Sequence, residues 1–178
     1  MSTLTPDDTL LGQIAIRDCH GYELIDAFRD SSALGDIWKM STSQIYAVLK
    51  RLEGQALIAG RVIESANAPS RTEYSLTPAG SQRLAAWLDD PQPSASIRRV
   101  RVEFLSRLFI ARRLNVPTVP IALRQRRACE DERERLLQER SSKRAGMSYL
   151  THELVIAQLD AVLRWIERCE MLPKDMET

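Results

Sequence analysis

The sequence predicts a mainly α-helical chain that contains one small β-hairpin and ends in a region made only of helices. Apolar residues recur at helical spacing within residues 20–54, which indicates two helices. Two stretches of strand-forming residues, at 55–65 and 71–77, then flank a polar loop and indicate a hairpin. After the proline-containing segment at 90–96, only helical patterns follow.

The first helix is predicted over residues 20–30, where the apolar positions are Tyr22, Leu24, Ile25 and Phe28. The connection that follows, SSALGDIWKM at 31–40, is longer than the tight turn that usually joins the helices of a helix-turn-helix.

The second helix is predicted over 41–54, because Ser41 and Gln44 have the spacing of a capping box. Its buried stripe is expected to comprise Ile45, Val48, Leu49 and Leu52. The other side carries Gln44, Tyr46, Ala47, Lys50 and Arg51. Such groups can meet base edges and phosphates in a major groove, although a plain amphipathic surface helix would show the same pattern.

The hairpin and the next helix complete a known arrangement. The strands enclose a polar loop with Asn67 and Pro69, and Thr77 then caps a helix that has Pro78 at its first position. Helix, helix, hairpin and helix make a winged helix-turn-helix, a unit that binds double-stranded DNA. The expected DNA-binding residues are Tyr22, Ser41, Thr42, Ser43, Gln44, Tyr46, Lys50 and Arg71.

The charge distribution favours this interpretation only locally. Residues 1–90 hold 8 Lys and Arg against 12 Asp and Glu, a net charge of −4. Within 39–71, however, 5 cations face 2 acidic residues, a net charge of +3. The acidity of residues 1–30 keeps a second function class open, a helical protein-interaction module whose winged helix no longer binds DNA.

The predicted domains are a DNA-binding unit at 1–90, a linker at 91–96 and a helical region at 97–178. That region holds a helix at 97–114, ended by a break at Asn115 to Pro117, and a charged helical segment at about 118–144. The last helix, about 148–171, carries a heptad seam predicted to form a homodimer through Val155, Leu159, Val162 and Ile166. Extra apolar width comes from Leu154, Ala157, Ala161 and Leu163. Packing against helix 97–114 alone is the alternative.

Aromatic residues allow a pocket for a small aromatic effector between subunits, lined by Phe104, Phe109 and Trp165. Core packing explains the same residues more simply.

Other chemistry is excluded or weak. His152 and Glu153 begin an HExxH-like string, but position 156 is Ile, so no zinc site is expected. No nucleotide-binding glycine loop or nucleophile elbow occurs, so neither enzyme activity nor a cofactor is predicted. The three cysteines are far apart and are expected to be reduced structural thiols. With no apolar stretch of membrane length and no signal peptide, a cytoplasmic protein without membrane contact is expected.

Four segments together resemble the phenolic-acid decarboxylase regulator (PadR) family of bacterial transcription factors: HGYELI at 20–25, IYAVLKRLE at 45–53, ALI at 56–58 and EYSLTPAG at 73–80. The resemblance implies a dimeric repressor or activator whose C-terminal helices pair the subunits. The C-terminal half looks like the larger subfamily with a virulence-activator-like helical region.

Some positions depart from the family pattern, which often has glycine, threonine and proline where this chain has Ser43, Gln44 and Ala47. These positions face DNA, so no operator sequence carries over. The wing is also less basic than usual, and its DNA contact is expected to be limited to Arg71 and its polar neighbours.

Overall fold

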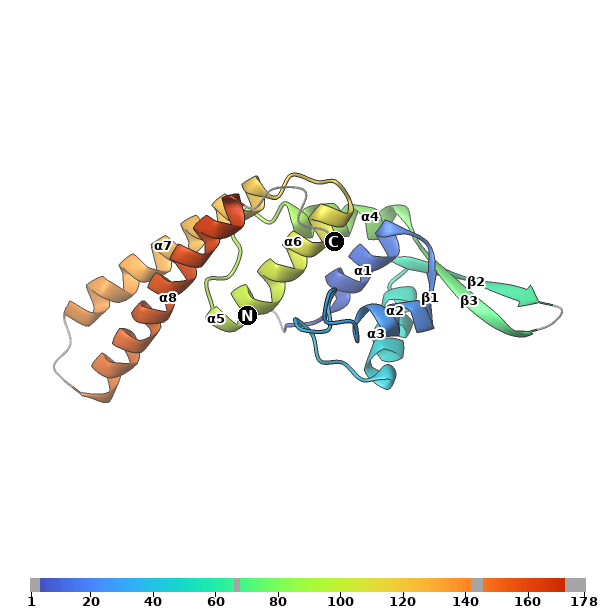
Figure 1. Ribbon diagram of the computed structural model, residues 1–178, viewed down its shortest axis with the longest axis horizontal. Coiled ribbons are helices and arrows are strands. Elements are labelled where there is room, and N and C mark those ends of the chain that lie inside the picture. Colours follow the sequence, from blue (N-terminus) through green and yellow to red (C-terminus); the bar gives the residue numbers. More distant parts are fainter. Residues whose placement is uncertain (1–3, 66–67, 142–145, 172–178) are drawn as a thin grey trace. The chain divides into compact units, whose positions relative to one another are not determined.

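The computed structural model describes residues 4–65, 68–141 and 146–171. It is mostly helical with a small three-stranded antiparallel sheet, which confirms the predicted fold class (Figure 1). The elements are α1 (Asp7–Ile16), β1 (Cys19–His20), α2 (Gly21–Ala27), α3 (Thr42–Gly54), β2 (Ile58–Ser65), β3 (Ala68–Leu76), α4 (Pro78–Leu88), α5 (Ile97–Arg99), the π-helical segment η1 (Val100–Phe104), α6 (Leu105–Arg113), α7 (Val119–Ser141) and α8 (Met147–Met171).

The chain forms two compact units whose boundaries differ from the predicted domains. The first unit contains Met1–Asp89 together with Leu105–Val116, and the second contains Asp90–Phe104 and Pro117–Thr178. Helix α6 joins the first unit because Ile110 packs directly on Gly12 of α1, where an added Cβ would lie 2.6 Å from the Ile110 side chain. Trp38 Nε1 also donates to Ser106 Oγ at 2.9 Å.

Helix α1 was not predicted from the sequence. It begins after Pro6 with Asp7 and Asp8 in its first turn, where carboxylates interact favourably with the helix dipole. Its Leu10 and Leu11 are 0% exposed. They belong to the core of the first unit, with Leu24, Phe28, Ile45, Leu49, Leu52 and Ile58.

The predicted hairpin is present, but it is part of a sheet with the strand order β1-β3-β2. Cys19 pairs with Tyr74 and His20 with Glu73, so residue 20 belongs to a strand and helix α2 starts one residue later. Within the expected polar loop, Pro69 lies in β3, whereas Asn67 lies outside the described residues. Helix α2 ends at Ala27, earlier than predicted, and the Asp30 side chain then accepts the Ser32 N–H at 2.9 Å in a turn.

The ends of α3 and α4 follow the sequence signals closely. Ser41 Oγ accepts the Gln44 N–H and caps α3, while Thr77 Oγ1 accepts the Gly80 N–H at 3.0 Å and caps α4. Beyond α3, Ala56 adopts a left-handed backbone with φ 55°. The Leu57 N–H then donates to the Leu52 carbonyl at 3.0 Å, as in a Schellman motif.

The helix predicted over 97–114 is divided into α5, η1 and α6. It stops where expected, because Asn115 has φ 57° and the Val116 N–H donates to the Ala111 carbonyl at 2.7 Å. In the second unit, α7 and α8 lie side by side (Figure 1). The predicted apolar line of α7, formed by Ala122, Cys129 and Leu136, is buried. Among the described residues, no helix has the length and hydrophobicity needed to cross a membrane.

Candidate DNA interface

Helix α3 separates an apolar face from a polar one as the sequence predicts. Ile45, Val48, Leu49 and Leu52 are buried, with exposures of 4% or less. The opposite face is exposed at Ser43, Gln44, Tyr46, Ala47, Lys50 and Arg51. Ser41 is exposed as well, and Thr42 is half-buried. The face that would meet DNA is therefore accessible, although Tyr46 and Arg51 also touch residues of α2 and α1.

Gln44 has less freedom than the sequence indicates, because its side chain serves the helix cap. Its Oε1 accepts the Ser41 N–H at 2.8 Å and lies 3.2 Å from Ser41 Oγ. A bidentate contact to adenine needs both the oxygen and the nitrogen of an amide. With Oε1 in the cap, the Gln44 NH₂ group can donate to base acceptors such as purine N7.

Two exposed tyrosines join α3, the start of α2 and strand β3 into one surface. The Tyr46 ring lies over Gly21, where an added Cβ would be 2.8 Å from the ring. Tyr22 stacks on His20 with ring centroids 5.6 Å apart, and the Arg71 guanidinium lies 5.6 Å from the Tyr22 ring centroid. This arrangement supports the wing arginine on an aromatic platform. Sequence reasoning missed that His20 helps to position Tyr22. His20 also contacts the Thr72 carbonyl through Nδ1 at 3.2 Å.

Arg29 is a second residue that sequence reasoning missed. It is exposed, and its guanidinium donates to Thr42 Oγ1 at 3.2 Å, beside the N-terminus of α3. A cation at a helix N-terminus adds to the attraction of the helix for phosphate. In the sequence, Arg29 lies directly before the long connection to α3, and this position could have indicated that it lies near the start of α3.

Of the five cations within residues 39–71, several are paired with acidic side chains, so the net positive charge available to DNA is smaller than their number indicates. Arg51 is bound to Asp7 of α1, whose hydrogen bonds raise the pKa of Arg51 above its ordinary value. Arg61 pairs with Glu73 at 3.0 Å, and Lys39 lies 3.7 Å from Asp36. Arg51 is exposed on the predicted side of α3, but its pairing with Asp7 leaves less positive charge for a phosphate than the sequence indicates. Lys50 is exposed, with no ion pair to the part of the chain that the structure describes.

In the second unit, the predicted dimer seam is largely occupied within the chain. Leu159 and Ile166 are 0% exposed, whereas Val155 and Val162 are half-buried. Because α8 packs along α7, the heptad spacing reflects this pairing, and Leu159 and Ile166 present no surface to a second subunit. The partner is α7, not helix 97–114 alone. Exposed apolar residues lie instead on another stripe of α8: Met147, Leu150, Leu154, Ala157 and Ala161.

Two of the three residues expected to line an effector pocket between subunits pack against each other within the chain, and the pocket itself stays a prediction. Phe104 is 0% exposed and meets Trp165 edge to face with ring centroids 5.8 Å apart, which is core packing. Phe109 belongs to the first unit, whereas Phe104 and Trp165 belong to the second.

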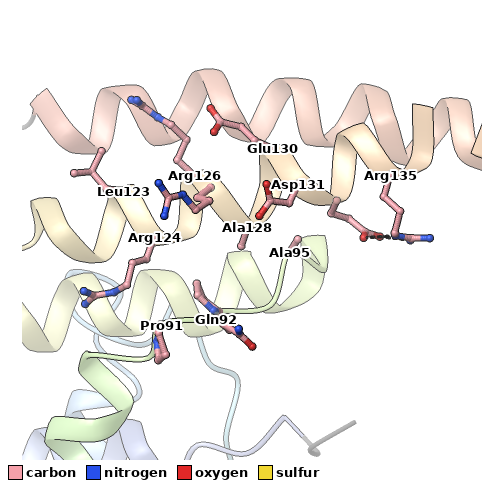
Figure 2. Close-up of a pocket in the computed structure, with 13 residues that line it drawn as sticks. Pro91, Gln92, Ala95, Leu123, Arg124, Arg126, Ala128, Glu130, Asp131 and Arg135 are labelled. Atoms are coloured by element: carbon pink, nitrogen blue, oxygen red, sulfur yellow. Dashed lines mark hydrogen bonds and ion pairs between the residues drawn. The ribbon is translucent and has the colours of Figure 1, made fainter. Parts of the chain in front are cut away.

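A cavity of about 860 Å³ lies elsewhere in the second unit, between the segment 91–95 and α7 (Figure 2). Its walls combine prolines and one leucine with charged side chains: Pro91, Gln92, Pro93, Ala95, Leu123, Arg124, Arg126, Arg127, Ala128, Glu130, Asp131, Glu132 and Arg135. The side chain of Arg135 is held by Glu132 and Glu139, which raise the pKa of Arg135.

The two residues that begin the HExxH-like string have contacts within the second unit. His152 Nδ1 contacts the Ser148 carbonyl at 2.6 Å, and Glu153 pairs with Arg140 at 2.9 Å. No cluster of His, Cys, Asp and Glu that could hold a metal ion occurs in the described ranges. Cys19, Cys129 and Cys169 are buried, and none of them forms a disulfide within the described residues.

Comparison with known proteins gives a consistent assignment for the first unit. Residues 10–86 match the transcriptional regulator PadR-like family. The negative transcriptional regulator PadR of Bacillus subtilis is 30% identical over 100 residues, a match that covers 56% of this chain and 53% of that protein. The matched part thus spans about half the length of this relative.

Solved structures are also similar. The crystal structure of Bacillus subtilis PadR in complex with operator DNA has a TM-score of 0.49 and 20% identity, and the match covers 96% of this chain and 99% of that one. The structure of the same regulator in complex with p-coumaric acid has a TM-score of 0.43 and 21% identity, with 93% of each chain covered.

Proposed function

We propose that this chain binds double-stranded operator DNA through α3 and acts as a repressor, because residues 10–86 match the PadR-like family of transcriptional regulators. Both the matching family and the similar protein of Bacillus subtilis are transcriptional regulators. The observation that carries the proposal is the exposed polar face of a capped α3, flanked by Arg29 and Arg71. Repression is proposed because the relative in Bacillus subtilis is a negative regulator.

The alternative function, a protein-interaction module without DNA binding, loses its main support. It rested on the acidity of the N-terminal residues. Asp7 and Asp8 are bound to Arg51 and Arg83 within the first unit, and Glu23 pairs with Arg17 at 2.7 Å. These carboxylates are thus partly neutralised where they stand and would repel DNA less than their number indicates.

To test this, the purified chain is used to select DNA fragments from the source genome. The affinity of the chain for a selected fragment is then measured. Lys50→Ala should weaken binding to all DNA and lower the salt dependence by about one phosphate contact. Gln44→Ala should mainly relax base preference at one position of the site. Binding that is unchanged by both substitutions would show that α3 is not the recognition helix.

We also propose that the operator is palindromic and is bound by a homodimer formed through the outer stripe of α8. Few cations face DNA from one chain, so two copies on a two-fold site would supply the phosphate contacts that one copy lacks. Leu150 and Leu154 are 56% and 60% exposed on α8, and with Ala157 they follow the spacing of a helix-pairing seam. This stripe replaces the seam through Leu159 and Ile166.

Sedimentation tests the dimer. Leu150→Glu combined with Leu154→Glu should give folded monomers, since two charges would be buried without partners at the interface. Val62→Glu is the control, because it charges an apolar residue of similar exposure, 63%, in the first unit. A dimer that survives the double substitution would rule out this stripe.

The cavity of the second unit carries a second proposal, that a small aromatic acid binds there as an effector. Arg124 and Arg127 both line the cavity and can bind a carboxylate. Pro91 and Leu123 offer apolar surface to a ring (Figure 2). The volume lies in the usual range for small-molecule sites.

Calorimetry with p-coumaric acid, the compound bound to the Bacillus subtilis regulator, is the test. Binding should weaken in Arg127→Ala and in a phenol that lacks the carboxylate. Arg113→Ala, an exposed arginine of the first unit, is the control. Equal binding of the acid by both arginine variants would place the effector elsewhere.

A further inference from the structure

Asp7 is a buried carboxylate that holds the C-terminal end of α3. Its side chain is only 7% exposed. Arg51, in the last turn of α3, donates to both of its oxygens: Nε lies 3.1 Å from Oδ2, and a terminal guanidinium nitrogen bonds Oδ1. Such a two-bonded pair fixes direction as well as distance.

Arg83 of α4 extends this contact into a cluster. Its Nε donates to Asp8 Oδ1 at 2.7 Å, and a terminal nitrogen lies 3.9 Å from Asp7 Oδ2. The other terminal nitrogen donates to Oε1 of Gln55, the residue that caps the end of α3, at 3.2 Å. The first turn of α1 is therefore joined to the end of α3 through Arg51 and, by way of Arg83, through Gln55.

From this geometry we propose that Asp7 and Arg51 are positioning residues that set the direction of α3 on DNA, and that Arg51 contacts no phosphate. The inference rests on the proposed DNA binding by α3. Gln44 lies seven residues before Arg51, about 10 Å along the helix, so a tilt of about 10° at Arg51 would move Gln44 by about 2 Å. A shift of this size breaks a hydrogen bond to a base.

The charge at Asp7 makes the proposal testable, because two explanations predict opposite results. Asp7→Asn removes a negative charge and releases Arg51, so simple electrostatics predicts tighter binding to any DNA. Positioning predicts weaker binding to the selected fragment, by about tenfold, the usual scale for coupled residues in direct contact. Binding to unrelated DNA should then stay the same or rise.

Arg51→Ala separates positioning from phosphate contact. It should weaken binding to the selected fragment and leave the salt dependence unchanged, whereas Lys50→Ala should lower that dependence by about one contact. Asp18→Asn is the matched control for Asp7→Asn, because Asp18 is an exposed aspartate of the same unit and its loss should not weaken binding.

Three results would overturn the proposal. One is a fall in salt dependence for Arg51→Ala as large as that for Lys50→Ala. The second is an Asp7→Asn chain that binds the selected fragment as tightly as the wild type. The third is a parallel loss of affinity for unrelated DNA in Asp7→Asn, accompanied by lower thermal stability in circular dichroism, which would mean general unfolding. A wild-type chain that selects no fragment would refute the proposed function itself, before any variant is measured.

Discussion

Helices α3 and α8 both bury one apolar stripe, but they differ in what they leave outside. The outer face of α3 is polar, with Gln44 and Lys50, and fits a polar partner. The outer face of α8 keeps Leu150 and Leu154 more than half exposed, which fits another apolar surface. The number of apolar faces on a helix therefore indicates how many partners it packs against. The spacing of the residues along one apolar stripe does not reveal which partner covers that stripe.

The largest expected effect concerns the buried stripe of α8. Leu159→Ala should lower the free energy of unfolding by about 2–5 kcal/mol, since it leaves a cavity at a fully buried position. Chemical denaturation measures this loss. Leu154→Ala is the control and should change the stability of the monomer by less than about 0.5 kcal/mol. Similar losses of stability for Leu159→Ala and Leu154→Ala would contradict the assignment of a buried face and an exposed face to α8.

The next effect concerns the start of α3. Ser41→Ala removes the hydroxyl that accepts the Gln44 N–H and should cost about 1 kcal/mol of stability. Thermal unfolding followed by circular dichroism measures it. Ser43→Ala, two residues later and also exposed, removes a hydroxyl that lies 3.0 Å from Ser41 Oγ but does not accept the Gln44 N–H, so its effect should be smaller. A larger loss for Ser43→Ala would mean that Ser41 is not the effective cap.

A smaller effect of opposite sign is expected at the other end of α3. Ala56 has φ 55°, a backbone that costs an L-residue about 1–2 kcal/mol, whereas glycine adopts it freely. Ala56→Gly should therefore stabilise the chain, by less than about 1 kcal/mol once the greater chain entropy of glycine is subtracted. A loss of stability in denaturant titration would contradict the left-handed backbone.

The smallest expected change concerns the reactivity of two buried thiols, Cys19 in the first unit and Cys129 in the second. Burial raises the pKa of Cys19 to about 12, and it also raises the pKa of Cys129. A group whose pKa is raised by folding stabilises the folded state below its unfolded value of about 9, and this contribution is lost as the pH rises from 9 to 12. Iodoacetamide should label neither thiol at pH 8 before unfolding. Rapid labelling of Cys19 in the native chain would contradict its burial.

The sequence predicted those features that depend on local signals. The cap at Ser41, the buried stripe of α3 and the break at Asn115 all depend on residues within a few positions of one another, and the structure confirms them.

Contacts distant in sequence were not predictable in the same way. Helical periodicity placed Arg51 on the polar side but could not show that Asp7, 44 residues earlier, would bind it. It also could not show that α7 would cover Leu159, or that α6 would return to α1, because periodicity gives a face and not its partner.

The packing of Ile110 on Gly12 has a consequence for how the chain can be divided. The first unit is discontinuous, since the chain leaves it at Asp89, returns at Leu105 and leaves again after Val116. A fragment cut at the apparent linker would lack α6 and uncover the side of α1 that packs on it. A single cut in the chain therefore cannot separate the two units, and a fusion protein that borrows the first unit must include α6 as well.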